Sequence, residues 1–197
     1  SDLIEPFPIY VLSNQHRLNG SSCILYQHLL HDFARPEEMA SKGGICHALL
    51  GAELVRPLLE ECGFPADVAE KVSRAVLTHR YRAGRRPATL EAEIVYDADK
   101  LDSLGAVGIG RAFLFAGREG ARLHNTAEEA LSSEAYSRED TAYREYLVKL
   151  CKLPECMLTG PGRRLAVERA AFMKAFFDRL NAETASAFSM AVSPFSG

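Results

Sequence analysis

Side chains that can bind a metal ion recur along the first half of the sequence. His31 and Asp32 are adjacent, two further histidines follow at His47 and His79, and Asp99 adds a later carboxylate. A neutral imidazole and a carboxylate can both bind one divalent cation, and a bound cation is the usual way to hold both inside a protein. A His-Asp pair is more often a surface histidine beside an aspartate at a helix end, so the pair alone does not establish a metal site.

The element expected to position His79 is a helix that begins near residues 64–67. Its apolar face runs through Val68, Val72 and Ala75, and His79 is the next position on that face. A histidine on an apolar face is more often a satisfied core residue than a metal ligand. The presence of several such groups on inward faces favours a metal site over this simpler interpretation.

A second helix, capped by Thr89, is expected to carry Asp99. Asp99 and Asp102 share a face with Val95 and Ala106 at helical spacing. An ionised carboxylate on an apolar face must be paired or metal-bound. The lysine next to Asp99 offers a simpler alternative, which is an ion pair on the helix surface.

One segment is a candidate for binding phosphate groups, and a second segment, rich in glycine, is not. Directly after His79 the chain carries four arginines, which are Arg80, Arg82, Arg85 and Arg86. They could form a phosphate clamp at the mouth of a site or a solvated basic loop, and the sequence favours neither. The glycines at 105, 108 and 110 indicate close helix packing rather than a phosphate loop, because no strand precedes them.

The remaining pattern predicts an all-α fold. Apolar residues recur at helical spacing, as in Leu50, Leu54 and Leu58, and alternating β-branched runs are few. Residues 118–136 are polar and are expected to form a loop or lid. The last helix is expected to start near residues 159–162 and to face inward with Leu165, Phe172, Met173, Phe176, Phe177 and Leu180. We expect one compact helical bundle over residues 1–197, with its core at about 21–117 and C-terminal helices at about 137–181 packed on it.

Composition and charge argue against several classes of partner. The 197 residues carry a formal net charge of −3, so a nucleic-acid polymer is not expected as a partner. No apolar run approaches the length of about 20 residues that spans a bilayer. We expect no leader of charged, apolar and small residues before the domain. The five cysteines form no Cys-x-x-Cys motif and are interpreted as reduced. We therefore expect a cytoplasmic protein, and its oligomeric state stays open.

The order His-Asp, His, His, Asp on successive helices resembles the HD superfamily of metal-dependent phosphohydrolases. Four segments are similar to one bacterial branch of it. They are Leu29-Leu30-His31-Asp32 with Ala34-Arg35-Pro36-Glu37-Glu38, Cys46-His47-Ala48 with Gly51-Ala52-Glu53, Leu77-Thr78-His79, and Asp97-Ala98-Asp99-Lys100-Leu101-Asp102. The resemblance covers about residues 24–180, and the last segment resembles that branch most closely. It implies a compact bundle of the HD-domain type.

The resemblance also implies a divalent metal ion, which would be Mn, Mg or Fe. His31, Asp32 and Asp99 match its ligands. His47 and His79 match positions that bind a second metal or contact the substrate phosphate in some relatives. A metal-activated water would then attack a nucleotide or another small phosphate ester or anhydride.

Charged residues near these ligands are given roles by the same resemblance. Lys100 and Arg35 would neutralise phosphate charge, as would Arg80 if the basic segment is a clamp. Asp102, or one of Glu37 and Glu38, would position water or a nearby base. The candidate catalytic residues are therefore Asp32, Lys100 and Asp102.

One position departs from the family pattern, which has a further histidine on the first helix, well before the His-Asp pair. At that distance this sequence has Ser1 to Leu3, and none of these residues is histidine. Two alternatives to a hydrolase stay open. One is a non-catalytic metal- or nucleotide-binding module that has lost this histidine, and the other is an HD-type di-iron oxygenase.

Overall fold

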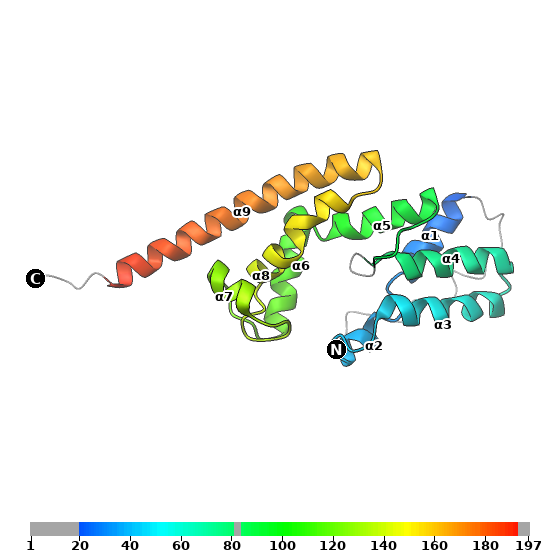
Figure 1. Cartoon of the computed structure of the whole chain (residues 1–197), viewed down its shortest axis with the longest axis horizontal. Helices are drawn as coiled ribbons and strands as arrows, with labels where there is room; N and C mark the ends of the chain where they lie inside the picture. Colours follow the sequence, from blue (N-terminus) through cyan, green and yellow to red (C-terminus); the bar gives the residue numbers. More distant parts are fainter. Residues whose placement is uncertain (1–19, 81–83, 193–197) are drawn as a thin grey trace, which may run out of the picture. The chain divides into compact units, whose positions relative to one another are not determined.

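The computed structural model describes residues 20–80 and 84–192, and every regular element in these ranges is a helix (Figure 1). The predicted all-α class is confirmed. The chain divides into two units, residues 1–96 and 97–197, and each is described by itself. The single domain over residues 1–197 stays a prediction. In the described part of the chain, no helix is long and apolar enough to span a bilayer.

The first unit is built around two helices that lie side by side. Its described helices are α1 (Gly20–Leu30), α2 (Arg35–Ala40), α3 (His47–Glu61), α4 (Ala66–Thr78) and the start of α5 (Leu90–Asp102). α3 runs along α4, and α1 packs against α4 (Figure 1). Their shared core contains Tyr26, Leu30, Ala52, Val55, Leu59, Ala69, Val72 and Val76. Burial of each large aliphatic side chain contributes about 1.5–3 kcal/mol, which holds these three helices together.

The helix indicated by the spacing of Leu50, Leu54 and Leu58 is present, but these leucines do not form its buried face. Leu54 is 41% exposed and the other two are only half-buried. The buried face instead contains His47, Ala48, Gly51, Ala52, Val55 and Leu59. A Cβ atom on Gly51 would lie 3.2 Å from Val76 of α4. Close approach of the two helices through small residues therefore decides which face is buried.

The predicted face of α4 is confirmed. Val72, Ala75 and His79 are buried, and Val68 is half-buried. The cap predicted for α5 is also present, since the backbone N–H of Ala92 donates to the hydroxyl of Thr89 at 3.3 Å. These two helices therefore begin and end close to where the sequence placed them.

The second unit is organised around its long C-terminal helix. Its described elements are the end of α5, α6 (Gly105–Arg118), α7 (Ala127–Ser132), α8 (Ala142–Val148), the 3₁₀-helix η3 (Leu150–Cys156) and α9 (Gly160–Val192). α9 packs against α6 and η3, and α8 contacts α6, α7 and η3. Helix α7 lies within the segment predicted to be a loop or lid. Thr126 and Glu129 form a capping box at its start, which stabilises this short helix.

Only part of the predicted inner face of α9 is buried. Met173 and Phe177 are buried, but Leu165 and Phe172 are 45% and 54% exposed, so these two inward positions were wrong. The buried stripe of α9 is narrow, because it is the side of the helix that packs against α6 and η3.

Asp97 anchors the start of α9. Its buried carboxylate accepts hydrogen bonds from the backbone N–H groups of Leu158 and Thr159, both at 2.8 Å, and from the Thr159 hydroxyl at 2.6 Å. A Cβ atom on Gly162 would lie 2.2 Å from this carboxylate, so only glycine allows the helix to begin so close.

Candidate metal centre

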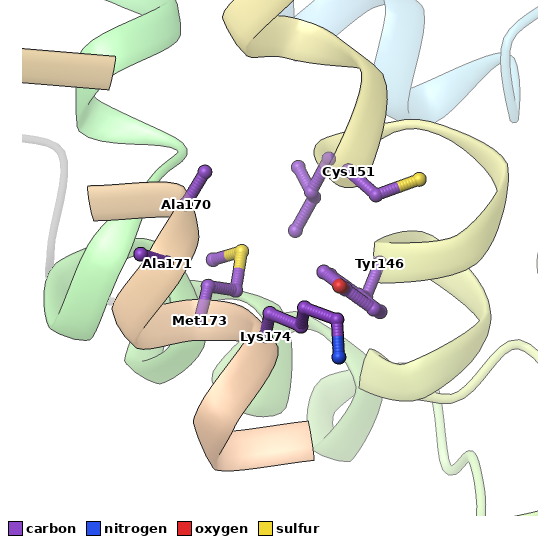
Figure 2. Close-up of a pocket in the computed structure, with 7 residues that line it drawn as sticks. Tyr146, Cys151, Ala170, Ala171, Met173 and Lys174 are labelled. Atoms are coloured by element: carbon purple, nitrogen blue, oxygen red, sulfur yellow. The ribbon is translucent and has the colours of Figure 1, made fainter. Parts of the chain in front are cut away.

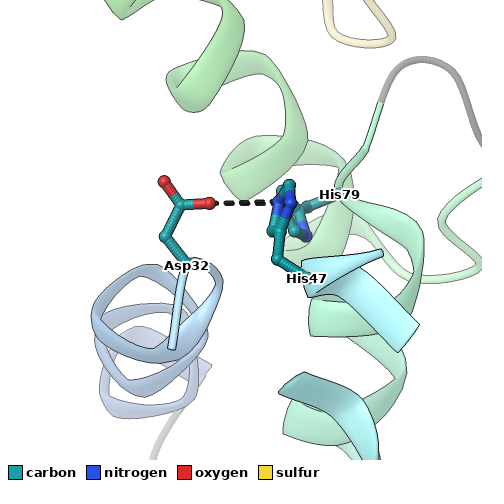
Figure 3. Close-up of side chains that lie close together, drawn as sticks. All are labelled: Asp32, His47 and His79. Carbon is teal, nitrogen blue, oxygen red and sulfur yellow. Dashed lines mark hydrogen bonds and ion pairs between the residues drawn. The ribbon is translucent and has the colours of Figure 1, made fainter. Parts of the chain in front are cut away.

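Three side chains from separate segments of the first unit converge at one point (Figure 3). Asp32 lies in the turn that follows α1, His47 is the first residue of α3, and His79 caps the end of α4. Oδ1 of Asp32 lies 3.2 Å from Nε2 of His47 and 3.6 Å from Nε2 of His79. The two Nε2 atoms are 3.0 Å apart. Both histidines are 2% exposed, whereas the Asp32 side chain is 42% exposed.

The other ring nitrogen of each histidine faces a hydrogen-bond acceptor. Nδ1 of His79 lies 2.6 Å from the carbonyl oxygen of Val76, and Nδ1 of His47 contacts the carboxylate of Glu38. Because a carbonyl and a carboxylate only accept, both Nδ1 atoms carry a proton, and in the neutral form of each ring Nε2 is left with a lone pair. Two lone pairs and a carboxylate facing one another repel unless a positive charge lies among them.

The spacing of these three atoms fits one divalent cation. Two ligand atoms that are each about 2.1 Å from the same ion are about 3.0 Å apart at a right angle and about 3.4 Å apart at the tetrahedral angle. The three spacings of 3.0, 3.2 and 3.6 Å agree with this range to within a few tenths of an ångström. Imidazole and carboxylate are also the donors that Mn and Fe accept.

Asp32 is ionised in this setting. Burial alone would raise its pKa, but hydrogen bonds from His47 and His79 hold the pKa of Asp32 well below the usual range of an aspartate. Such a bond requires a proton on Nε2, so either a proton or a cation lies between these groups. A bound metal ion would displace that proton.

His31 lies beside this group. Its Nε2 is 3.7 Å from Oδ2 of Asp32, which is the oxygen that faces away from His47 and His79. Its Nδ1 is 2.5 Å from the carbonyl oxygen of His28, so this nitrogen carries a proton. The role of His31 as a ligand stays a prediction.

A buried carboxylate lies behind His47. The sequence did not indicate that it would be a neighbour of this histidine. Glu38 of α2 is 4% exposed and contacts His47, Arg35 and Arg80. The sequence offered Glu37 and Glu38 equally, and only Glu38 is buried. Adjacent residues of a helix point about 100° apart, so only one of these two carboxylates can face inward. The sequence carries no signal that selects which one.

The other predicted site residues lie in the second unit. Nζ of Lys100 donates to Asp99 at 3.0 Å, and Lys100 is 3% exposed. Burial lowers the pKa of Lys100, although the charge of Asp99 opposes this effect. The side chain of Asp102 is 64% exposed and pairs with Arg111 at 3.4 Å, so the expected inward face of Asp102 is wrong. The chemical roles of these residues stay predictions.

The second unit also has a pocket, and its lining residues are distant in sequence from Asp99, Lys100 and Asp102. Its volume is about 230 Å³, and Tyr146, Cys151, Met173 and Lys174 are among its lining residues (Figure 2). None of the predicted site residues lines it.

The missing first-helix histidine was expected at residues 1–3, which lie outside the described residues.

Comparison with known families gives the identity of this region. The family model of the HD domain matches residues 22–104. Residues 22–104 are an HD domain. Every predicted metal, catalytic and phosphate-binding residue lies within this range, so the candidate metal centre lies within the HD domain.

A curated relative is the uncharacterized protein YpgQ of Bacillus subtilis (strain 168). It is 38% identical over 109 residues, which are 55% of this chain and 47% of YpgQ. The alignment therefore spans about half the length of that relative. The crystal structure of YpgQ has 26% identity and a TM-score of 0.54, and covers 82% of this chain and 86% of YpgQ. YpgQ has also been solved in complex with ADP.

Two further solved structures share the fold of the HD domain. A predicted HD superfamily hydrolase from an uncultured Thermotogales bacterium has 29% identity and a TM-score of 0.52, covering 82% of this chain and 67% of that one. An HD-superfamily hydrolase from Bacillus thuringiensis has 26% identity and a TM-score of 0.58, covering 88% of this chain and 79% of that one. The chain thus has the fold of HD-superfamily hydrolases.

Proposed function

We propose that this protein is a metal-dependent phosphohydrolase that acts on a nucleotide or another small phosphate ester or anhydride. The observation that carries the proposal is the convergence of the Asp32 carboxylate with Nε2 of His47 and His79. Similarity to HD-superfamily hydrolases supports a hydrolytic reaction. The ADP complex of YpgQ supports a nucleotide as the substrate class.

Asp32, His47 and His79 would hold the cation, and their donor set suits Mn²⁺, Mg²⁺ or Fe²⁺. A divalent cation bound there would make a water molecule more acidic and would polarise a phosphoryl oxygen. Asp32 is the exposed member of the three, so substrate can approach from its side. Buried His47 and His79 exclude bulk water from the opposite side.

Positive charge lies next to this group. Arg35 and Arg80 both contact Glu38, so two guanidinium groups face one carboxylate and leave net positive charge beside His47. This charge favours an anionic substrate such as a phosphate group. The assignments of His31, Asp99, Lys100 and Asp102 rest on the family resemblance and are part of the proposal.

The proposal is tested by metal binding and by phosphate release. We expect the protein to bind Mn²⁺ in isothermal titration calorimetry and to release phosphate or pyrophosphate from at least one nucleotide or phosphomonoester. Asp32→Ala should abolish both, because it removes the only charged ligand among the three converging side chains. Asp67→Ala is a matched control, since Asp67 lies on α4 in the same unit with a side chain 69% exposed and paired with Lys71.

Four results would contradict parts of this proposal. Equal Mn²⁺ binding by Asp32→Ala and the unmodified protein would remove Asp32 from the metal centre. Bound metal without release from any substrate would favour a non-catalytic module. Two irons per chain with an oxygen-dependent product would favour a di-iron oxygenase. Unchanged metal content in Asp99→Ala would remove Asp99 from the proposed ligands.

A further inference from the structure

Glu38 is a buried carboxylate with every oxygen engaged. Its Oε1 lies 2.7 Å from Nη2 of Arg80, and its Oε2 accepts from Nη1 of Arg35 at 3.0 Å and from Nδ1 of His47. The Arg35 and His47 nitrogens are 3.3 Å apart and share this oxygen. Glu38 is therefore an anion held by three donors.

Helix ends explain why His47 needs such a partner. His31 follows the end of α1 and His79 caps the end of α4, where carbonyl oxygens of the last turn are free to accept. Each of these histidines uses the carbonyl three residues before it, which are those of His28 and Val76.

His47 lies at the opposite kind of helix end. It is the first residue of α3, where the free backbone groups are N–H donors rather than acceptors. No helical carbonyl is available to fix its Nδ1 proton. The Nδ1 of His47 instead contacts a side-chain carboxylate, which is that of Glu38.

We propose that Glu38 is a positioning residue that fixes the tautomer and orientation of His47. By accepting the Nδ1 proton, it leaves the lone pair of Nε2 facing Asp32 and His79, and its charge makes that nitrogen a stronger donor to a cation. Glu38 also fixes Arg35 and Arg80 at its two oxygens, so one side chain aligns a ligand and two positive charges. This inference rests on the proposed function, because it takes Asp32, His47 and His79 as the cation-binding group.

The main test compares Glu38→Gln with Glu37→Gln. Glutamine keeps the volume of Glu38 but loses its charge and turns an NH₂ group toward one of its three donors. We expect the Kd for Mn²⁺, measured by calorimetry, to rise about 10- to 100-fold in Glu38→Gln. Glu37→Gln should leave it unchanged, since Glu37 is the exposed neighbour on the same helix.

A second measurement needs no metal and no activity. Long-range ¹H–¹⁵N correlation spectra of the metal-free protein report which ring nitrogen of His47 carries the proton. We expect the Nδ1–H form in the unmodified protein and a shift toward the Nε2–H form in Glu38→Gln. His31 and His79 should keep their tautomers in the variant, because backbone carbonyls fix them.

The outcomes separate this inference from the proposed function. Mn²⁺ binding that is equal in Glu38→Gln and the unmodified protein would overturn the role of Glu38 and leave the metal centre intact. An Nε2–H form of His47 in the unmodified protein would overturn it even if the variant does not fold. Absence of Mn²⁺ binding in the unmodified protein, with His47 in its Nδ1–H form, would overturn the proposed function and the role of Glu38 toward a cation together.

Discussion

At the scale of single residues, Arg80 differs from Arg85 and Arg86 of the same basic segment, while Arg82 lies outside the described residues. Arg80 donates to Sγ of Cys46 at 3.2 Å and pairs with Glu38 at 2.7 Å. Burial alone would lower its pKa, but the contacts with Cys46 and Glu38 raise the pKa of Arg80 above its usual value. Arg85 and Arg86 are exposed. Arg80 is therefore fixed beside His47, as expected of part of a phosphate clamp, whereas Arg85 and Arg86 fit a solvated loop.

This difference predicts unequal effects of two substitutions. Arg80→Gln should raise the KM for a phosphate substrate about tenfold or more, because a hydrogen bond from a charged donor to an anion is worth about 1.5–3 kcal/mol. Arg85→Gln should change the KM little, since its side chain is solvated. Steady-state kinetics with the nucleotide identified in the substrate screen would measure this difference in KM between the two variants. Equal effects of the two variants would mean that bulk charge, rather than a placed guanidinium group, attracts the substrate.

At the scale of elements, the corner between α5 and α6 depends on glycine. Gly105 has a φ of 71°, a left-handed conformation that side-chain-bearing residues rarely adopt. A Cβ atom on Gly108 would lie 2.2 Å from the backbone oxygen of Ser103 and 3.1 Å from Met173 of α9. The close helix packing predicted for these glycines is therefore confirmed at Gly108.

Two glycines of α6 should respond in opposite ways to alanine. Gly108→Ala should lower the free energy of unfolding by about 1–3 kcal/mol, because the backbone of Ser103 has to move. Gly110→Ala should raise it by about 0.5–1 kcal/mol, since no atom lies within 4 Å of the added Cβ and alanine favours the helix. Urea unfolding followed by circular dichroism measures both. Destabilisation by Gly110→Ala would show that α6 does not tolerate a side chain on that face.

The contrast between α3 and α4 shows what a sequence pattern can resolve. On α4 the apolar spacing selected the buried face correctly, because Val72 and Ala75 meet neighbours on one side. On α3 the leucine spacing indicated a helix, but the leucines do not mark its buried face. Small residues such as Gly51 let two backbones approach closely, and a search for large apolar side chains misses them.

At the scale of the whole molecule, the proposed metal binding would be coupled to folding. A cation that binds only the folded chain at 100 times its Kd stabilises it by about 2.7 kcal/mol. For a chain of this length, that corresponds to a rise in Tm of about 5–10 °C. We expect Mn²⁺ to produce this rise in differential scanning calorimetry, and Asp32→Ala to abolish it.

The same scan tests the single domain predicted over residues 1–197. One cooperative domain gives one transition, and Mn²⁺ should move all of it. Two transitions, of which Mn²⁺ moves only one, would show that residues 1–96 and 97–197 unfold separately. A Tm that does not respond to Mn²⁺ at any concentration would contradict binding of the ion by the folded chain.

The sequence by itself determined the helical class, the residue types of the metal centre and the resemblance to HD phosphohydrolases. These depend on local spacing and residue chemistry, which are present in the chain before it folds. Only the tertiary structure decided that Asp32, His47 and His79 meet, that α3 buries its small residues, and that Glu38 rather than Glu37 lies behind His47. Each of these depends on atoms from segments distant in sequence, and the energy of such contacts is set only when the helices pack.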